Sequence, residues 1–268
     1  MILDEIVAAK KKEHRRSKEE RTPGDLRSKA RSAPPLKPFE VRQEGAVSII
    51  AEIKRASPSK GPIRPDLDPA DLARRYAEGG ARALSVLTEK EFFKGSVEDL
   101  RAARLAVNIP VLRKDFIIDE YQLWEARVML ADAALLIARL LGPRQLADYA
   151  ALAREDLKLT VLVEVHDEYD LEAALDARVP LIGINNRDLD TFRVSLETTA
   201  RLRPMIPSGV TTVSESGLST REDLVLLRAL RVDAALIGEE LVRSEDPIRT
   251  LRQLLGAEDA HPRNPGRH

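Results

Sequence analysis

The chain has 268 residues, with 43 Lys and Arg against 44 Asp and Glu, four histidines and no cysteine. This length suits one large domain with a sizeable core. The balanced charge gives no global field that favours nucleic acid or a membrane, and the lack of cysteine excludes disulfides, thiolate metal sites and cysteine nucleophiles. No apolar run reaches the ~20 residues that span a bilayer. We recognise no signal peptide, and we expect a monomeric, cytoplasmic protein.

Residues 1–46 precede the first predicted strand and form an N-terminal helical extension. The extension starts with a short apolar stripe, which we expect to dock on the rest of the fold: Ile2, Leu3, Ile6 and Val7. The charged run at residues 10–16 is interpreted as a solvated helix face and not as a nucleic-acid site. At the other end, residues 257–268 are polar and contain proline, which predicts a disordered tail.

Over residues 47–256, short apolar strands alternate with helical patterns such as Pro69–Glu78, Val97–Val107 and Glu120–Met129. Asp68-Pro69 and Ser219–Glu222 are helix-start signals. The predicted strands are Val47–Lys54, Ala83–Thr88, Pro110–Lys114, Ala133–Ile137, Thr160–Val165, Leu181–Asn185, Thr211–Ser214 and Ala234–Ile237. The alternation implies parallel strands with crossover helices, and eight such units predict an α/β fold, a closed (β/α)₈ barrel. A doubly wound open sheet is the rival, but a glycine-rich dinucleotide loop is missing after the first strand.

The first strand ends in a charged pair. Because side chains alternate along a strand, Ile50, Glu52 and Lys54 share one face. Burying such a pair in a packed core is costly, so it fits the mouth of an open site that binds an anion. The loop that follows adds the hydroxyl of Ser57. A strand-end ion pair without function is the alternative interpretation.

Polar residues also follow the later strands, which is where (β/α)₈ barrels place their chemistry. Lys114, Glu164 and Asn185 each continue a column of inward-pointing side chains. With the others they should converge on one mouth: Arg187 after the sixth strand, Glu215 and Ser216 after the seventh, and Glu239 after the eighth. A lysine there is suited to act as a general acid or as a Schiff-base nucleophile, with a glutamate as the complementary base.

Two glycines suggest where an anion binds. Gly217 and Gly238 follow the seventh and eighth strands, where this fold commonly binds phosphate through backbone N–H groups. Phe93, Phe116 and Leu135 are candidates for the wall of the mouth, although core packing is the commoner role of such residues.

The histidines offer little material for a metal site or a catalytic triad, so we predict no metal and no cofactor. His166 is interpreted as a solvent-exposed loop residue.

Together the motifs resemble the indole-3-glycerol phosphate synthase family of tryptophan biosynthesis over essentially the whole chain. The resemblance rests on Ile53–Gly61, Leu87–Glu89 with Phe93–Ser96, Arg113–Phe116, Leu162–Glu164, Gly183–Leu189, Val213–Gly217 and Ile237-Gly238. It implies a barrel whose mouth is covered by the N-terminal extension. It also implies ring closure of 1-(2-carboxyphenylamino)-1-deoxyribulose 5-phosphate to indole-3-glycerol phosphate, with loss of carbon dioxide and water and no metal or redox cofactor.

The resemblance also implies roles for single residues. Lys114 is the general acid of ring closure, Glu164 is the acid and base of dehydration, and Lys54 binds substrate and can donate a proton at one stage. Glu52 holds Lys54 or Lys114 and stabilises developing positive charge. The remaining implied contacts are Asn185, Arg187 and Glu215 with substrate polar groups, Ser57 with the bound anion, Phe93, Phe116 and Leu135 with the anthranilate ring, and Ser216, Gly217, Gly238 and Glu239 with the phosphate.

Three other interpretations of the function remain open. One is a neighbouring sugar-phosphate isomerase, which would rely on a carboxylate pair and not on Lys54 and Lys114. Another is a Schiff-base aldolase, which borohydride trapping would detect. The third is a barrel that binds a phosphorylated ligand without turnover, for which we would expect an eroded catalytic position.

Overall fold

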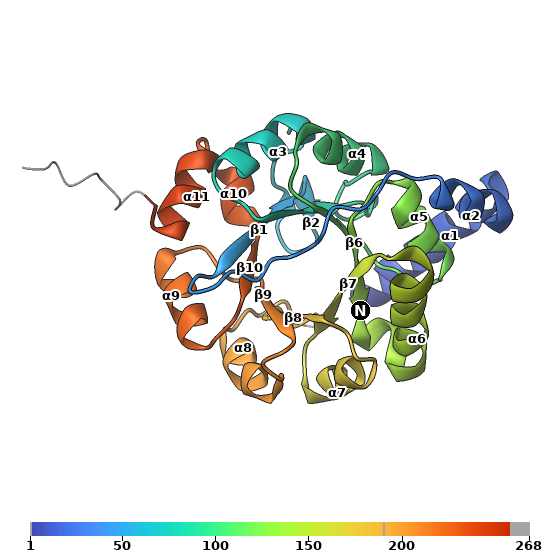
Figure 1. The fold of residues 1–268 in the computed structure, drawn as a ribbon. Helices are drawn as coiled ribbons and strands as arrows, with labels where there is room; N and C mark the ends of the chain where they lie inside the picture. The colour runs from blue at the N-terminus through green and yellow to red at the C-terminus, as the bar shows by residue number, and fades with distance from the viewer. Residues whose placement is uncertain (1, 190, 258–268) are drawn as a thin grey trace, which may run out of the picture.

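The computed structural model describes residues 2–189 and 191–257, and within them eight parallel strands close into a barrel (Figure 1). The strands around the barrel follow the order β1, β10, β9, β8, β7, β6, β5, β4. Their bounds are β1 Ser48–Ile53, β4 Ala83–Leu87, β5 Val111–Lys114, β6 Ala133–Ile137, β7 Thr160–Val165, β8 Leu181–Asn185, β9 Thr211–Glu215 and β10 Ala234–Ile237. The predicted (β/α)₈ barrel is therefore confirmed, with all eight strands placed to within one residue at either end.

Helices surround the barrel and cover the outer faces of its strands (Figure 1). They are α3 Pro69–Glu78, α4 Val97–Ala106, α5 Tyr121–Val128, α6 Ala138–Leu152, α7 Glu168–Asp176, α8 Glu197–Leu202, α9 Arg221–Ala229, α10 Glu239–Arg243 and α11 Pro247–Leu255. A small hairpin of β2, Ala56–Ser57, and β3, Gly61–Pro62, interrupts the connection after β1. The barrel part of the chain also contains a π-helical turn at Ala153–Leu157 and a 3₁₀ turn at Arg203–Met205.

Alternation along the strands divides the apolar residues into two layers. On β1, Ile50 points into the barrel with Leu112, Leu162 and Val213 from other strands. The neighbouring residue Ile49 faces outward and packs in the larger layer between strands and helices. Since the inward columns end at the carboxyl ends of the strands, polar residues placed there meet on the barrel axis.

Side-chain caps fix the starts of several helices, among them α3 and α9. Asp68 caps α3 as predicted, accepting hydrogen bonds from the backbone N–H groups of Ala70 and Asp71. The cap of α9 is Thr220, one residue later than the predicted Ser219. Thr220 and Asp223 form a reciprocal capping box, because each side chain accepts from the other's backbone N–H.

The N-terminal extension consists of α1, Ile2–Glu20, and α2, Pro23–Arg31, followed by an extended segment that leads into β1. Helix α2 packs against α5, and Leu26 and Ala30 join the outer apolar layer. Ile6 of α1 instead joins the inner layer, with Ile2 and Leu3 packed against it. The predicted docking of the apolar stripe is confirmed for Ile2, Leu3 and Ile6.

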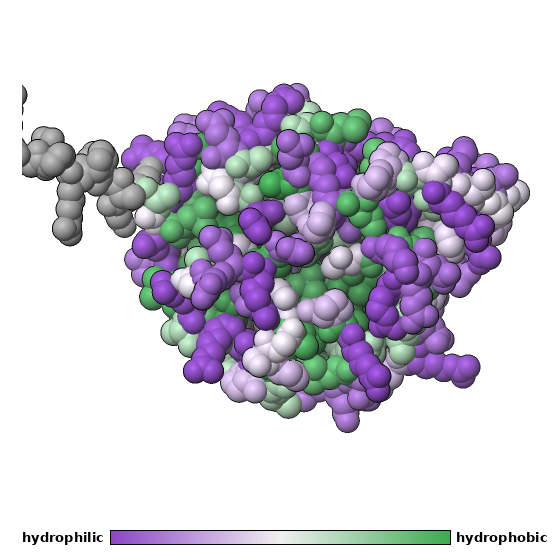
Figure 2. Space-filling view, in the orientation of Figure 1, coloured by the Kyte–Doolittle hydropathy of each residue, from purple (hydrophilic) through white to green (hydrophobic). Residues whose placement is uncertain are grey.

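The surface in Figure 2 shows hydrophilic residues over most of the rim, with hydrophobic residues visible between them nearer the barrel axis. Among the described residues, no helix is long and apolar enough to cross a membrane. The tail predicted to be disordered lies outside the described residues, except for Ala257.

Candidate active site

The carboxyl ends of the strands surround a cavity of about 630 Å³, a size typical of small-molecule sites. Every residue that the sequence analysis selected for the site lines this cavity. They are Glu52, Lys54, Ser57, Phe93, Lys114, Phe116, Leu135, Glu164, Asn185, Arg187, Glu215, Ser216, Gly217, Gly238 and Glu239. The structure therefore brings together residues from all eight barrel strands or the loops directly after them.

Lys114 at the end of β5 lies between two carboxylates. Its Nζ is 2.7 Å from Glu164 Oε2 on β7 and 3.0 Å from Glu215 Oε2 on β9. Burial opposes the charged form of this amine, but Glu164, Glu215 and Glu52 outweigh it and hold the pKa of Lys114 above its ordinary value. The lysine is therefore a protonated donor at neutral pH.

The pKa values of the two carboxyl groups beside Lys114 are shifted in opposite directions. Burial would raise the pKa of Glu164, but Lys114 and His166 outweigh it and hold that pKa below its usual range. Burial raises the pKa of Glu215 to about 7, with nearby Glu164 adding to the effect and Lys114 opposing it. One carboxylate is thus held ionised while its neighbour titrates near neutrality, an arrangement suited to acid–base chemistry.

Two glycines make room for carboxylates. A Cβ added to Gly183 would lie 2.1 Å from Glu215 Oε1, and one added to Gly238 would lie 2.3 Å from Glu52 Oε1. Any side chain at these positions would displace the carboxylates from the lysines. Gly238, which the sequence analysis connected with phosphate, thus also accommodates the side chain of Glu52.

The pair on β1 stands beside this cluster. Lys54 Nζ is 2.7 Å from Glu52 Oε1, so the structure pairs Glu52 with Lys54. On β8, Asn185 donates from Nδ2 to Glu164 Oε1 at 3.1 Å and accepts from the backbone N–H of Arg187 at 3.0 Å. Asn185 therefore orients Glu164 in this structure.

A tight turn follows β9. Ser216 has a φ of 69° and Gly217 a φ of 77°, a left-handed pair that is strained at the serine. The backbone N–H groups just before α9 already have a partner, since Asp223 accepts from the N–H groups of Ser219 and Thr220. The turn at 216–217 and the neighbouring Gly238 are the backbone features that remain for an anion at this end of the cavity.

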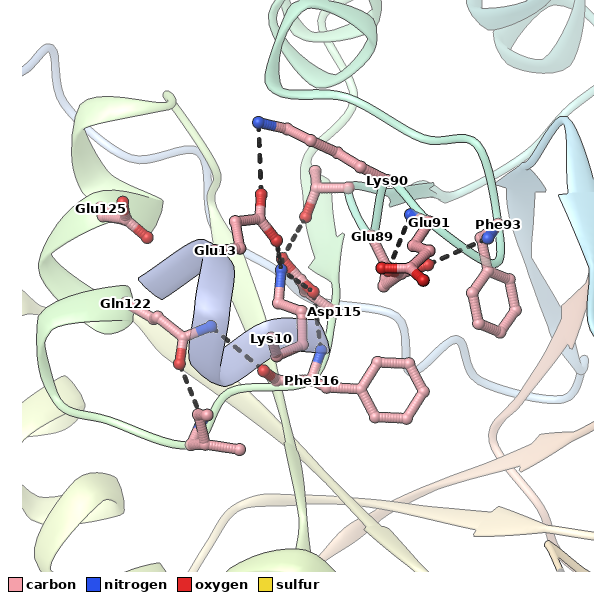
Figure 3. Close-up of polar contacts among 12 residues, drawn as sticks. Lys10, Glu13, Glu89, Lys90, Glu91, Phe93, Asp115, Phe116, Gln122 and Glu125 are labelled. Carbon is pink, nitrogen blue, oxygen red and sulfur yellow. Dashed lines mark hydrogen bonds and ion pairs between the residues drawn. The ribbon is translucent and has the colours of Figure 1, made fainter. Parts of the chain in front are cut away.

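Aromatic rings form the opposite wall. The rings of Phe93 and Phe116 lie 6.0 Å apart, centroid to centroid. Buried Glu89 holds the loop that carries Phe93, because its carboxylate accepts from the backbone N–H groups of residues 91, 92 and 93. Figure 3 shows the contacts with Glu91 and Phe93. From the extension, Ile2, Leu3 and Ile6 close this part of the cavity.

An ion-pair chain ties α1 to the same loops. Lys10 Nζ is 2.9 Å from Asp115 Oδ1, directly after Lys114 in the sequence (Figure 3). Glu13 bridges Lys10 at 2.6 Å and Lys90 at 3.2 Å. Lys10 is 2% exposed, so the interpretation of its charged run as a solvated face is wrong for this residue. Its position fits the stripe of Ile2 and Ile6, since residues four apart share a helix face.

His166 was also misplaced by the sequence analysis. It is 8% exposed and lies just beyond β7, not in a solvent-exposed loop. Its Nε2 is 3.3 Å from Glu164 Oε1, and its Nδ1 is 3.3 Å from Asp170 Oδ2. The alternation that was applied to Glu164 also carries to residue 166, and that signal would have placed it on the same face.

Further cavity residues come from the loop after β8, where Leu189, Phe192 and Val194 reach the cavity. Leu189 ends the Gly183–Leu189 motif, but Phe192 and Val194 have no sequence signal, because isolated apolar residues in a loop have no periodicity. Among the described residues, no group of three or more His, Cys, Asp or Glu side chains is arranged to hold a metal ion.

The closed parallel barrel, with lysines and carboxylates gathered at the carboxyl ends of its strands, defines a (β/α)₈-barrel enzyme that acts on a small charged molecule. The family model for indole-3-glycerol phosphate synthase matches residues 3–254. The chain belongs to the indole-3-glycerol phosphate synthase family, whose members are decarboxylating lyases.

Curated relatives agree with this assignment. Indole-3-glycerol phosphate synthase of Bordetella pertussis is 48% identical, with 95% of this chain and 98% of the relative covered. The enzyme of the same name from Polaromonas naphthalenivorans is 54% identical over 79% of this chain and 80% of its own length.

Solved structures with the same barrel fold are more distant in sequence. Thiamine phosphate pyrophosphorylase from Pyrococcus furiosus superposes with a TM-score of 0.59 at 14% identity, covering 81% of this chain and 98% of that one. KGPDC from Streptococcus mutans has a TM-score of 0.59 at 13% identity, covering 78% and 95%. At these identities the likeness concerns the fold.

Proposed function

We propose that the cavity at the mouth of the barrel converts 1-(2-carboxyphenylamino)-1-deoxyribulose 5-phosphate to indole-3-glycerol phosphate, carbon dioxide and water. The observation that carries the proposal is the protonated Lys114, held between Glu164 and Glu215 beside the wall of Phe93 and Phe116. A proton donor next to an aromatic wall is what the closure of an aromatic amine onto a sugar carbonyl requires.

In the ring-closing step, the anthranilate ring packs against the wall of Phe93, Phe116 and Leu135. The ring carbon that bears the carboxylate attacks the C2′ carbonyl carbon, and Lys114 donates its proton to the carbonyl oxygen. A lysine whose pKa is raised is a poor nucleophile, so its surroundings favour the acid role over a Schiff base. Positive charge that develops on the anilinium side is stabilised by the carboxylates of Glu52 and Glu164.

Loss of carbon dioxide from that ring carbon then yields the indoline. In the dehydration that follows, the new hydroxyl group leaves as water while a proton is removed from the ring. We assign this acid–base work to Glu164, which Asn185 and Lys114 hold in place. Glu215 lies on the other side of Lys114, with its Oε2 3.0 Å from the lysine Nζ. We assign to it contacts with polar groups of the substrate.

The sugar phosphate is assigned to the far end of the cavity. The backbone N–H groups of Ser216, Gly217, Gly238 and Glu239 would hold its oxygens, with Ser57 and its loop closing over the anion. Lys54 places a positive charge near the anionic substrate, and Glu52 keeps that lysine in place. Arg187 orients the polar groups of the sugar chain.

We further propose that residues 1–46 form a cover for the mouth and that residues 47–256 are the catalytic barrel. The positions of Ile2, Leu3 and Ile6 in the cavity support this division. The buried contact of Lys10 with Asp115 supports it as well. We also propose that the chain works as a monomer in the cytoplasm, which size-exclusion chromatography and cell fractionation would test.

The deciding experiment mixes purified protein with the carboxyphenylamino-deoxyribulose phosphate and follows indole fluorescence. Formation of indole-3-glycerol phosphate, confirmed by mass spectrometry, is the expected result. Borohydride added during turnover should leave the protein mass unchanged, since no imine forms in the proposed reaction. Absence of product, or a reduced covalent adduct on a lysine, would contradict the proposal.

A further inference from the structure

Behind Glu164 lies a pair of buried residues that the proposed mechanism does not use. His166 and Asp170 are 8% and 2% exposed. Glu164 and His166 are two residues apart at the end of β7, so both side chains turn to the same side. The imidazole Nε2 is 3.3 Å from Glu164 Oε1, the oxygen that also accepts from Asn185, while Lys114 contacts Oε2.

Asp170 fixes the orientation of the imidazole. Its Oδ2 accepts from the backbone N–H of His166 at 3.0 Å and lies 3.3 Å from Nδ1 of the ring. Asp170 is itself held, because its backbone N–H donates to the helix cap Asp167 at 2.9 Å. With Nδ1 placed at Asp170, Nε2 lies 3.3 Å from Glu164 Oε1, an ion-pair contact without a hydrogen bond in the described residues.

The surroundings favour a charged imidazole. Burial would lower the pKa of His166, but Asp170 and Glu164 outweigh it and raise that pKa to about 9. Other charged groups on neighbouring elements also act near this pair, and Asp167 at the start of α7 interacts with His166 directly. The others are Lys114 on β5 and Glu215 on β9, which interact with Glu164, and Arg139 on α6, which is 3.3 Å from Asp167.

Glu164 therefore lies between two cations, Lys114 and His166. In the proposed reaction Lys114 turns from Glu164 to the substrate. When Lys114 turns to the carbonyl of a substrate and donates its proton, the buried carboxylate loses its 2.7 Å partner. A buried carboxylate without a counter-charge would take up a proton and turn away.

We propose that His166 is a positioning residue for Glu164: held by Asp170, its imidazolium keeps the carboxylate ionised and oriented while Lys114 engages the substrate. The inference rests on the proposed function, since it assigns a task during that reaction. It adds to the site a three-residue chain, Asp170–His166–Glu164, that starts on α7 and ends at the reacting groups.

His166→Gln is the informative variant, because it keeps a donor of similar size and removes the charge. We expect kcat to fall by about tenfold or more with KM changed less than about twofold, as is typical for groups that orient a functional side chain. Since the lost cation favoured the ionised form of Glu164, the acid limb of the kcat/KM profile should move to higher pH by about one unit. Asp170→Asn should move the limb in the same direction by less.

Tyr169→Phe is the matched control, as Tyr169 lies on α7 beside Asp170 and is 65% exposed, and its variant should behave as the wild type. Unchanged kcat and an unshifted acid limb in folded His166→Gln protein would overturn the inference. An independent test uses unmodified protein: the ¹⁵N shifts of His166 should be those of an imidazolium at pH 7, and a neutral ring would overturn the inference without any activity assay. Lack of product from wild-type protein would instead contradict the proposed function, so the two failures are distinguishable.

Discussion

Replacing Lys114 by methionine tests the central ion-pair cluster, because methionine keeps most of the volume and removes the charge. The carboxylates of Glu164 and Glu215 then lose a cation that is 2.7 and 3.0 Å away. Turnover should fall by orders of magnitude, since ring closure loses its acid, while binding of the phosphorylated substrate is largely kept.

The effect on stability can be worked out from the protonation of Glu164. Glu164 keeps a second cation, because His166 Nε2 remains 3.3 Å from its Oε1. The loss typical of a broken buried ion pair, about 3–5 kcal/mol, is therefore reduced, and protonation of the carboxylate sets its upper limit. For a carboxyl group with an ordinary pKa of 4.5, protonation costs about 3 kcal/mol at pH 7 and less than about 1 kcal/mol at pH 5. Glu215 adds little, because its pKa is already raised to about 7.

The direction of the pH dependence follows from the pKa of Glu164 in the folded wild type and in the folded variant. In the wild type the pKa of Glu164 is lowered, so the pair stabilises the protein above the unfolded value and the effect is lost as pH falls. In the variant that pKa is higher than in the wild type, because one of its two neighbouring cations is gone, so the loss of stability at pH 7 is at least as large as at pH 5. Urea unfolding at pH 5 and pH 7 measures the difference. A loss that is smaller at pH 7 than at pH 5, or no loss at pH 7, would refute the ion-pair reasoning, and near-normal turnover would remove Lys114 from the mechanism.

Further predictions concern the extension, the glycines and metal ions. Lys10→Met should lower the free energy of unfolding by about 1–3 kcal/mol and raise KM, whereas Lys18→Met on the exposed side of α1 should cost less than about 1 kcal/mol; equal effects in urea titrations would contradict the buried tether. Gly183→Ala should push Glu215 off its lysine, lowering turnover at least tenfold and stability by about 1–3 kcal/mol. Gly209→Ala is its control, because a Cβ there meets open space. Equal turnover and stability of the two variants would refute the clash. EDTA should leave the rate unchanged, because the proposed proton transfers use side chains, and inhibition reversed by a metal would show otherwise.

The barrel was predictable because its strands carry strong local signals. Ala133–Ile137 and Leu181–Asn185 are short apolar runs between helical patterns, and both were placed without error at either end. Alternation then identified Lys114 and Glu164 as inward-facing, since the period of two fixes which side chains point to the axis.

Contacts between distant segments were less accessible to sequence reasoning. The partner of Lys10 is Asp115, more than a hundred positions away, and a charged run gives no sign of which of its members will be buried. His166 was misplaced because a lone histidine is usually exposed, and the imidazole is buried here only because two carboxylates surround it. Gly183 is explained only by the side chain of Glu215 on the adjacent strand.

The docking of α1 has a practical consequence for handling the protein. Ile2 already contributes to the wall of the cavity, so an affinity tag or fluorescent label fused ahead of it would begin beside the substrate. The final helix α11 packs against α3 and α9 on the outside of the barrel (Figure 1). Tags, surface immobilisation and fusion partners are therefore better attached at the carboxyl terminus, and kinetic values obtained with an amino-terminal tag should be compared with those of the cleaved enzyme.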